Sequence, residues 1–455
     1  MDRFLTERRF VAITFLLFAS ITLFTTLHHE PWGDETDVWV VGRDGGLSAI
    51  FEFTAYRGTP ALWYVVVWPF AASGAPYFVQ QILHLAIAWA AVLLFLRYAP
   101  FPRWARALFA LSYFPAFEYS AVARPYALLM LLLFFVAHQW RTREDQPVRL
   151  AVAIALMANT TLYGLIIAAV LGAVLLVEWR RWTPILITLA GGLACVAQLW
   201  PRAGGQKVYT HATLETVWYT LAAAFFPEMR QADGLMFAIP ILLIVVFAIS
   251  RHVVPMMFLI GTLSFLMVVY VYVWMGGIRH AGIITLVVIA AVWMAKTYGP
   301  LRAEKLAMVG LSVAFAWSVY AASNAWVSER NRNFSDSRGA GMFLQKVDPD
   351  IQLVAPLPLS ATAYLPDRRF WYASLGEYGT FTTWDARFAA ARYLPMETSV
   401  SLAKARFSGQ KWLLVSNSEI PSSLAREFRL LYRTKGENWV RYDEHYWIYE
   451  PLPAP

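Results

Sequence analysis

The stretch that decides the fold is residues 10–27, which read FVAITFLLFASITLFTTL without a charged side chain. A helix crosses the hydrocarbon core of a bilayer with about 20 predominantly apolar residues, and windows of this kind recur as far as residue 322. The sequence therefore predicts a polytopic α-helical membrane protein with about eleven transmembrane helices. We expect the spans at residues 10–27, 77–97, 104–122, 125–140, 149–162, 163–178, 183–200, 235–250, 253–274, 279–295 and 305–322.

The composition favours a membrane location. Of the 455 residues, 58% are hydrophobic and 15% are charged, whereas a soluble domain carries about 25% charged residues. The 20 Trp and 22 Tyr suit a lipid–water boundary. Because Cys195 is the single cysteine, an internal disulfide is excluded. We attribute the net charge of +8 to cytoplasmic loops and expect no nucleic-acid partner.

Basic residues orient the chain. With a cytoplasmic N-terminus, every segment placed inside carries Arg or Lys, and the long segments 28–76 and 201–234 lie outside, as the positive-inside rule requires. The compact loops favour a bacterial inner membrane. We therefore expect a membrane domain over residues 1–322 and a periplasmic domain over residues 323–455.

The region after residue 323 loses the long apolar runs and gains charge, Pro and Ser. Its length of about 130 residues is enough for a core of its own. Short apolar and aromatic runs predict a mixed α/β domain. We expect strands at 351–355, 369–372 and 411–415, a hairpin over 439–449 that turns at 443–445, and helices at 385–394 and 421–428.

Acidic residues gather directly after the first predicted span, where residues 28–37 read HHEPWGDETD. Transfer of a group to a hydroxyl at a membrane surface needs a carboxylate that takes the proton of that hydroxyl, and Asp34 and Glu35 supply candidates. A solvated acidic loop explains the same residues equally well. A divalent metal at Asp34 and Glu35 is a third interpretation, although the adjacent His28 and His29 lack the spacing typical of metal ligands.

Four short motifs follow one another in the sequence: WGDE at 32–35, GTPALWY at 58–64, YSAVARPYAL at 119–128 and GIRH at 277–280. In this order they resemble the GT-C superfamily of membrane glycosyltransferases, particularly its protein O-mannosyltransferase and aminoarabinose transferase branch. The resemblance covers the first 140 residues best and the late spans weakly. Some relatives carry a second acid before the fourth span; Ala123 and Arg124 occupy that neighbourhood here, and Glu118 is the nearest carboxylate.

The resemblance implies an inverting glycosyltransferase whose donor is a polyprenyl-phosphate sugar. Asp34 would be the catalytic base, with Glu35 assisting it or contacting a metal. Arg124 and Arg279 would lie at outer helix ends and bind the donor phosphate, whose developing charge needs cations. The acceptor would be a lipid, a glycan or a protein at the outer face, and membrane lipids would surround the spans. We expect the periplasmic domain to recognise the acceptor.

Other polar residues are candidates for the same site, each with a structural alternative. A histidine in or beside a span, such as His84 or His280, also serves as a hydrogen-bonded packing partner. The loop that contains Lys207 is either a lid over the donor phosphate or a solvated connector. The further candidates are His280, Lys207 and Tyr126 for the phosphate, and Glu118, His84, Tyr56 and Arg57 for a substrate or a structural role.

A polytopic transporter or lipid-carrier flippase is the alternative class. Transporters often contain internal repeats and charges near the middle of the membrane. This sequence shows no internal repeat, and its charged residues gather beside the long outer segments. The pattern therefore favours surface chemistry over transport.

Overall fold

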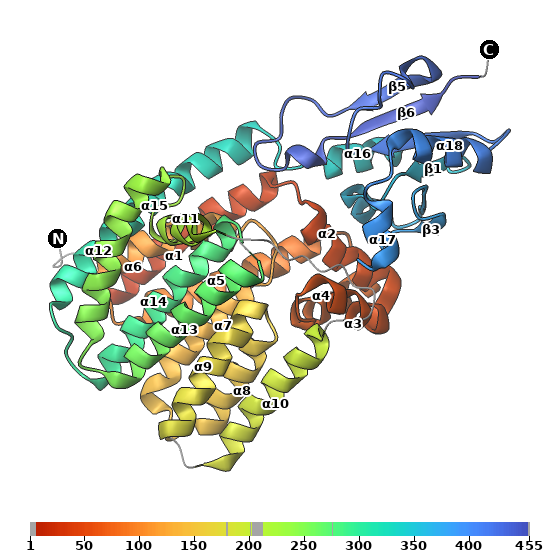
Figure 1. The fold of residues 1–455 in the computed structure, drawn as a ribbon. Helices are drawn as coiled ribbons and strands as arrows, with labels where there is room; N and C mark the ends of the chain where they lie inside the picture. Colours follow the sequence, from red (N-terminus) through yellow and green to blue (C-terminus); the bar gives the residue numbers. More distant parts are fainter. Residues whose placement is uncertain (1–5, 179–180, 201, 203–212, 275, 454–455) are drawn as a thin grey trace.

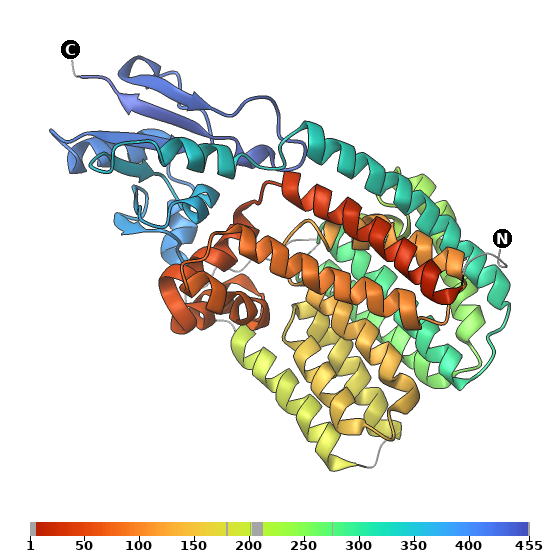
Figure 2. The same cartoon turned by 180° about the vertical axis from the view of Figure 1, so that it is seen from behind.

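A computed structural model describes residues 6–178, 181–200, 202, 213–274 and 276–453. A large helical bundle is followed by a smaller C-terminal domain, residues 332–453, which lies at one end of the bundle (Figures 1 and 2). The bundle is built of long apolar helices and the C-terminal domain contains a mixed sheet. The predicted fold class, a polytopic helical membrane protein with a mixed α/β C-terminal domain, is confirmed.

Each predicted span except 104–122 coincides with one helix. Within the described residues, seven helices are long and apolar enough to cross a membrane, and α8 and α9 are shorter apolar helices. The bundle helices are α1 (Glu7–His28), α5 (Phe78–Tyr98), α6 (Arg103–Ala110), α7 (Tyr126–Gln139), α8 (Pro147–Ala158), α9 (Leu162–Glu178), α10 (Trp182–Leu199), α11 (Leu214–Phe225), α12 (Gln231–Ile249), α13 (Val253–Tyr272), α14 (Ile278–Tyr298) and α15 (Glu304–Asn331).

The predicted span 104–122 was wrong as a single helix. Helix α6 ends at Ala110, and a buried π-helical turn follows over Phe114–Glu118. Pro115 has no N–H to donate to the carbonyl four residues earlier, so the α-helix cannot continue through it. The chain from the π-helical turn to Arg124 is therefore irregular but buried. This irregular segment approaches α14, whose residues 281–295 are all buried at the centre of the bundle.

The predicted outer loop 28–76 is helical. It forms α2 (Gly33–Val40), a π-helical turn over Val41–Gly45, α3 (Gly46–Arg57) and α4 (Leu62–Ala72). Their apolar side chains, including Trp39, Phe53 and Trp63, make a buried cluster of their own. These three helices lie between the bundle and the C-terminal domain (Figure 1). Helix α15 continues past residue 322 and leads directly into that domain.

The C-terminal domain is built on a six-stranded sheet in the order β3-β2-β1-β4-β6-β5. Strand β1 pairs in parallel with β2 and β4, and the other pairs are antiparallel. Leu353 faces a core that includes Leu344, and Val354 faces a second core that includes Val400, so α16 and α18 cover opposite faces. The elements are α16 (Ser337–Leu344), β1 (Gln352–Ala355), β2 (Phe370–Tyr372), β3 (Glu377–Gly379), α17 (Ala386–Ala391), α18 (Met396–Arg406), β4 (Trp412–Ser416), β5 (Phe428–Arg433) and β6 (Trp447–Pro451).

The strands predicted at 351–355, 369–372 and 411–415 are present, but the hairpin over 439–449 was wrong. Strand β6 pairs with β4 and β5 instead. Residues Tyr442–Glu444 form a 3-10 turn, and the Glu444 carboxylate accepts a hydrogen bond from the Gly33 N–H at the start of α2. The predicted helix 421–428 is reduced to the 3-10 turn Ala425–Glu427, because Phe428 enters β5. Contacts distant in sequence overrode the local pattern at both places.

Candidate active site

Asp34 is the second residue of α2, and arginines surround its carboxylate. Its Oδ2 lies 3.1 Å from Arg124 Nη1, and its Oδ1 lies 3.5 Å from Arg57 Nη1. Arg124 also donates a hydrogen bond to the Asp34 carbonyl at 2.8 Å. Trp32 is extended and precedes the helix, which places Asp34 in the first turn, where the helix dipole favours a negative charge.

These surroundings keep Asp34 ionised. Burial raises the pKa of Asp34, but Arg124, Arg57, Arg279 and Arg441 together lower it further, so the pKa lies below its ordinary value. The carboxylate is therefore negative at neutral pH and is able to accept a proton. The predicted base thus stands among four guanidinium groups.

Glu35 faces a different, fully buried cluster. Its Oε1 lies 3.0 Å from His29 Nε2, and the other ring nitrogen of His29 lies 3.0 Å from Glu329 of α15. Its Oε2 accepts a hydrogen bond from the Ala123 N–H at 2.5 Å. Burial lowers the pKa of His29, but the two carboxylates outweigh it and raise the pKa to about 10. The cluster therefore holds an imidazolium between two carboxylates and ties α2 to α15 and the segment before α7.

The side chains around Asp34 and Glu35 do not fit the divalent metal that the sequence left open. Arginine nitrogens contact both Asp34 oxygens, while His29 and the Ala123 N–H contact those of Glu35. In the part of the chain that the structure describes, no group of three or more His, Cys, Asp or Glu side chains is arranged to hold a metal ion.

The two predicted phosphate ligands lie close together. Arg124 belongs to the irregular segment before α7, and Arg279 is the second residue of α14. Their guanidinium carbons lie 6.0 and 4.9 Å from the centre of the Trp32 ring. Both arginines lower the pKa of Asp34. The structure therefore brings the predicted base and the predicted phosphate ligands together around Trp32.

Glu118 contacts Arg279 from the π-helical turn. Its Oε1 lies 3.7 Å from Arg279 Nε, and its Oε2 accepts a hydrogen bond from the Tyr113 hydroxyl at 3.3 Å. The neighbouring Tyr119 hydroxyl donates to the Arg279 carbonyl at 2.5 Å. These contacts support the structural alternative for Glu118, as a buried partner that positions Arg279.

His84 and His280 both hold backbone near a predicted phosphate ligand. The His84 ring nitrogens lie 2.8 Å from the Arg124 carbonyl oxygen and 3.1 Å from that of Ser120. His280 Nδ1 accepts a hydrogen bond from the Gly277 N–H at 2.6 Å, at the start of α14. Both arrangements support the structural alternative, in which the histidines position Arg124 and Arg279.

The remaining predicted residues are Tyr126, Tyr56 and Lys207. Tyr126 is buried, and its ring stacks on Tyr119 at 5.5 Å. Tyr56 is half-buried on α3, next to Arg57. Lys207 lies outside the described residues, so the structure does not test its predicted role.

The C-terminal domain supplies two side chains that sequence reasoning missed. The Arg441 guanidinium carbon lies 3.7 Å from the centre of the Trp32 ring. The Arg57 guanidinium carbon lies 3.8 Å from the centre of the Trp384 ring. Neither residue stands in a motif, and both are far from residues 32–57 in the sequence. Only the tertiary fold reveals that they belong to the site.

Hydrogen bonds anchor the C-terminal domain to the segment that carries Asp34. The C-terminal domain therefore forms one side of the site. The bonds are from the Gly33 N–H to Glu444 at 2.7 Å, from the Ser337 hydroxyl to the Pro31 carbonyl at 2.5 Å, and from Arg338 to the His29 carbonyl at 3.1 Å.

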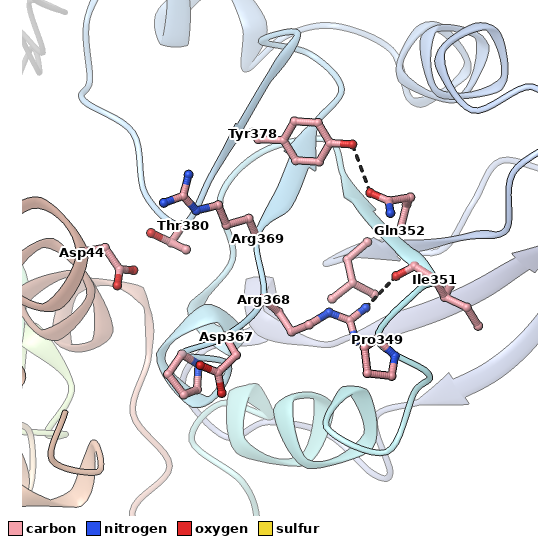
Figure 3. A pocket seen from close by; sticks show the side chains of 11 residues that line it. Asp44, Pro349, Ile351, Gln352, Asp367, Arg368, Arg369, Tyr378 and Thr380 are labelled. Carbon is pink, nitrogen blue, oxygen red and sulfur yellow. Dashed lines mark hydrogen bonds between the residues drawn. The ribbon is translucent and has the colours of Figure 1, made fainter.

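A cavity of about 380 Å³ lies where the C-terminal domain faces the π-helical turn that follows α2 (Figure 3). Asp44 approaches it from that turn, and Arg369 and Thr380 line it on the side of the domain. Arg368 is engaged within the domain, since it donates to the Ile351 carbonyl at 2.6 Å. Asp34 does not line this cavity, which is therefore separate from the arginine cluster.

Comparison with solved structures identifies the architecture. The chain superposes on ArnT from Cupriavidus metallidurans in the apo state, with a TM-score of 0.56 and 13% sequence identity, over 97% of this chain and 98% of that chain. The chain has the GT-C fold. No protein-family model and no curated protein matches the sequence. At this identity the likeness to ArnT establishes the GT-C fold alone, so the activity has to be argued from the side chains around Asp34.

Proposed function

We propose that this GT-C protein is an inverting glycosyltransferase that moves a sugar from a polyprenyl-phosphate-sugar donor to an acceptor at the outer face of the membrane. One observation carries the proposal: an ionised carboxylate, Asp34, lies beside two guanidinium groups, Arg124 and Arg279, that have been brought together around one aromatic ring. A base beside a cationic phosphate site is the combination that this transfer requires.

The reaction follows from these positions. Asp34 accepts the proton of the acceptor hydroxyl, whose oxygen attacks the anomeric carbon of the donor sugar. The bond from that carbon to the phosphate oxygen breaks, and its electron pair leaves with the polyprenyl phosphate. Arg124 and Arg279 stabilise the negative charge that develops on the leaving phosphate.

The proposal extends to the arrangement of the chain in the membrane. The membrane domain, residues 1–322, would carry the site, and the domain of residues 323–455 would lie in the periplasm of a bacterium whose inner membrane holds the protein. The N-terminus would be cytoplasmic. The basic residues in the segments placed inside support this orientation.

Transfer of a radiolabelled sugar tests the proposal. Purified protein in detergent is given a panel of polyprenyl-phosphate sugars and a crude membrane fraction as acceptor, beside an Asp34→Asn variant. Loss of a general base typically lowers the rate by about 10²- to 10⁴-fold, so near-total loss is expected in a variant that still melts cooperatively as a folded protein. Glu52→Gln, an exposed acid on α3, is the matched control and keeps the parent rate.

Two outcomes contradict the proposal. Full activity of Asp34→Asn shows that Asp34 is not the base, and absence of transfer from every donor contradicts the activity. A chelator is added in a parallel reaction. Because the oxygens of Asp34 and Glu35 already have arginine, histidine and backbone partners, transfer is expected to continue in its presence.

A further inference from the structure

Three guanidinium groups lie over the ring of Trp32, and they come from three separate parts of the chain. Arg441 is the closest, with its guanidinium carbon 3.7 Å from the ring centre, and Arg279 and Arg124 follow at 4.9 and 6.0 Å. Trp32 is only 8% exposed. The arginine of the C-terminal domain therefore shares its aromatic partner with the two proposed phosphate ligands.

Several nitrogen donors of this cluster, and of Arg57 beside Asp34, are unsatisfied. Trp32 Nε1 and the Nε atoms of Arg57, Arg124 and Arg441 are buried without a hydrogen-bond partner. Buried polar groups are normally hydrogen-bonded, so a set of unpaired donors on neighbouring side chains calls for a ligand. Every donor in the set is an N–H group, and three of the four belong to cations, so the ligand that satisfies them carries negatively charged acceptor oxygens.

Of the three arginines, Arg441 is the most available to bind a ligand, because its carboxylate partner is the most exposed. Arg124 pairs with Asp34 at 3.1 Å, and Arg279 lies 3.7 Å from Glu118. The partner of Arg441 is Asp443, at 2.6 Å, whose side chain is 67% exposed. An ion pair with a solvated carboxylate contributes little, so Arg441 can exchange Asp443 for a phosphate at small cost.

We propose that Arg441 is a third phosphate-binding arginine, which the C-terminal domain supplies, and that it closes the site over the phosphate of the lipid donor together with the Trp32 Nε1–H. The proposal rests on the proposed function, since it takes the polyprenyl phosphate as the ligand. It assigns the C-terminal domain a part in donor binding, in addition to the acceptor recognition expected from the sequence. The phosphate is thereby held from the bundle on one side and from the C-terminal domain on the other.

Binding of undecaprenyl phosphate without a sugar tests this inference independently of transfer. The full chain in detergent is titrated with the lipid, and Kd is measured for the parent, Arg441→Ala, Arg441→Lys and Arg433→Ala. Arg433 is an exposed arginine of the same domain and is the matched control. Loss of a charged hydrogen bond predicts a Kd about 10- to 100-fold higher for Arg441→Ala, a smaller rise for Arg441→Lys and no change for Arg433→Ala.

A second variant separates phosphate binding from a merely structural role of Arg441. Asp443→Asn removes the exposed competitor of the phosphate, so it is expected to lower Kd by about 2- to 5-fold, a change of up to about 1 kcal/mol. Domain docking alone would not produce this tightening. Inorganic phosphate is titrated in parallel. Competition by inorganic phosphate at millimolar concentration shows that the head group is recognised. If neither inorganic phosphate nor the Arg441→Ala substitution changes the Kd for the lipid, the inference is overturned.

The outcomes distinguish this inference from the proposed function. Equal Kd values for the parent and Arg441→Ala overturn the role of Arg441, while Asp34-dependent sugar transfer still supports the glycosyltransferase. Failure of the parent to bind undecaprenyl phosphate also overturns the inference. If Arg441→Ala fails to fold, the Arg441→Lys and Asp443→Asn values decide the question.

Discussion

Glu444 accepts a hydrogen bond from the Gly33 N–H at 2.7 Å, although the two residues are 411 positions apart in the chain. Gly33 is the first residue of α2, and Asp34 follows it. A carboxylate at a helix N-terminus accepts a hydrogen bond from a free N–H group, and its negative charge is stabilised by the positive end of the helix dipole. The last part of the chain therefore fixes the start of the helix that carries the proposed base.

The ionisation of Glu444 makes the stability of the folded protein depend on pH. Burial raises the pKa of Glu444 to about 7 from 4.5, although hydrogen bonds from Ser335, Gly33 and Ser360 offset part of the effect. Between these two pH values the unfolded chain releases the proton while the folded chain retains it, so stability falls as the pH rises. Below pH 4.5 the full contribution of the protonated group is present. We expect the apparent melting temperature to fall between pH 5 and 7.5.

Glu444→Gln tests this dependence, because the amide oxygen can still accept the Gly33 hydrogen bond and does not titrate. The fall in melting temperature between pH 5 and 7.5 is expected to be smaller in Glu444→Gln than in the parent. Glu437→Gln, at an exposed position of the same region, is expected to keep the parent slope. Identical slopes in all three proteins would contradict the assignment to Glu444.

The buried cluster of His29, Glu35 and Glu329 gives a prediction about stability. His29→Ala leaves two carboxylates buried without their cation, and removal of one partner of a buried pair costs about 3–5 kcal/mol. The apparent melting temperature of His29→Ala is expected to fall by several degrees. His28→Ala is the control, since His28 is exposed. Equal melting temperatures for the two variants would show that the cluster does not stabilise the fold.

Hydropathy predicted the bundle because the constraint is local: a helix in a bilayer must be apolar along its own length. It failed at 104–122, where Pro115 interrupts the hydrogen bonds although the composition stays apolar. It also failed at 439–449, where alternation indicated a hairpin but Glu444 is bonded to Gly33. Both failures place irregular backbone next to the site, where tertiary contacts outweigh local preference.

The site shows the same division. Asp34, Arg124 and Arg279 stand in short motifs, so the resemblance to GT-C proteins was enough to single them out. Arg441 and Trp384 stand in no motif. Arg441 lies over Trp32, and Trp384 contacts Arg57, only because the C-terminal domain folds back onto the segment that holds α2 and α3. The acidity of Asp34 could not be predicted either, since it depends on four arginines from distant segments.

Arg124 is expected to control both donor affinity and the proton affinity of Asp34. Arg124→Ala removes a charged hydrogen bond to the proposed donor phosphate, so the KM for the donor is expected to rise about 10- to 100-fold. It also removes the largest cationic influence on Asp34, which raises the pKa of that carboxyl. Because the base must be ionised, the acid limb of the kcat/KM profile is expected to move to higher pH.

Arg124→Lys separates the two effects. The lysine keeps the positive charge near Asp34, so the acid limb is expected to stay close to that of the parent. It lacks the planar fork of donors, so the KM for the donor is expected to remain raised. An acid limb that stays in place in Arg124→Ala would show that Arg124 does not set the proton affinity of the base.

Gly282 allows the irregular segment before α7 to approach α14. A Cβ at this position would clash with the Phe114 ring and the Tyr119 hydroxyl, and overpacking of this kind costs about 1–3 kcal/mol. The same hydroxyl donates to the Arg279 carbonyl at 2.5 Å. Gly282→Ala is therefore expected to lower the apparent melting temperature, and also to raise the KM for the donor by displacing Arg279.

Gly192→Ala is the matched control for this prediction. Gly192 also lies within a long apolar helix, α10, but the nearest atom to an added Cβ there is Leu165 Cδ1 at 3.9 Å, an ordinary contact. A helical glycine replaced by alanine without a clash gains stability, since alanine has the higher helix propensity. The two variants should therefore shift the melting temperature in opposite directions. A stabilised Gly282→Ala with an unchanged donor KM would show that the segment adapts without moving Arg279.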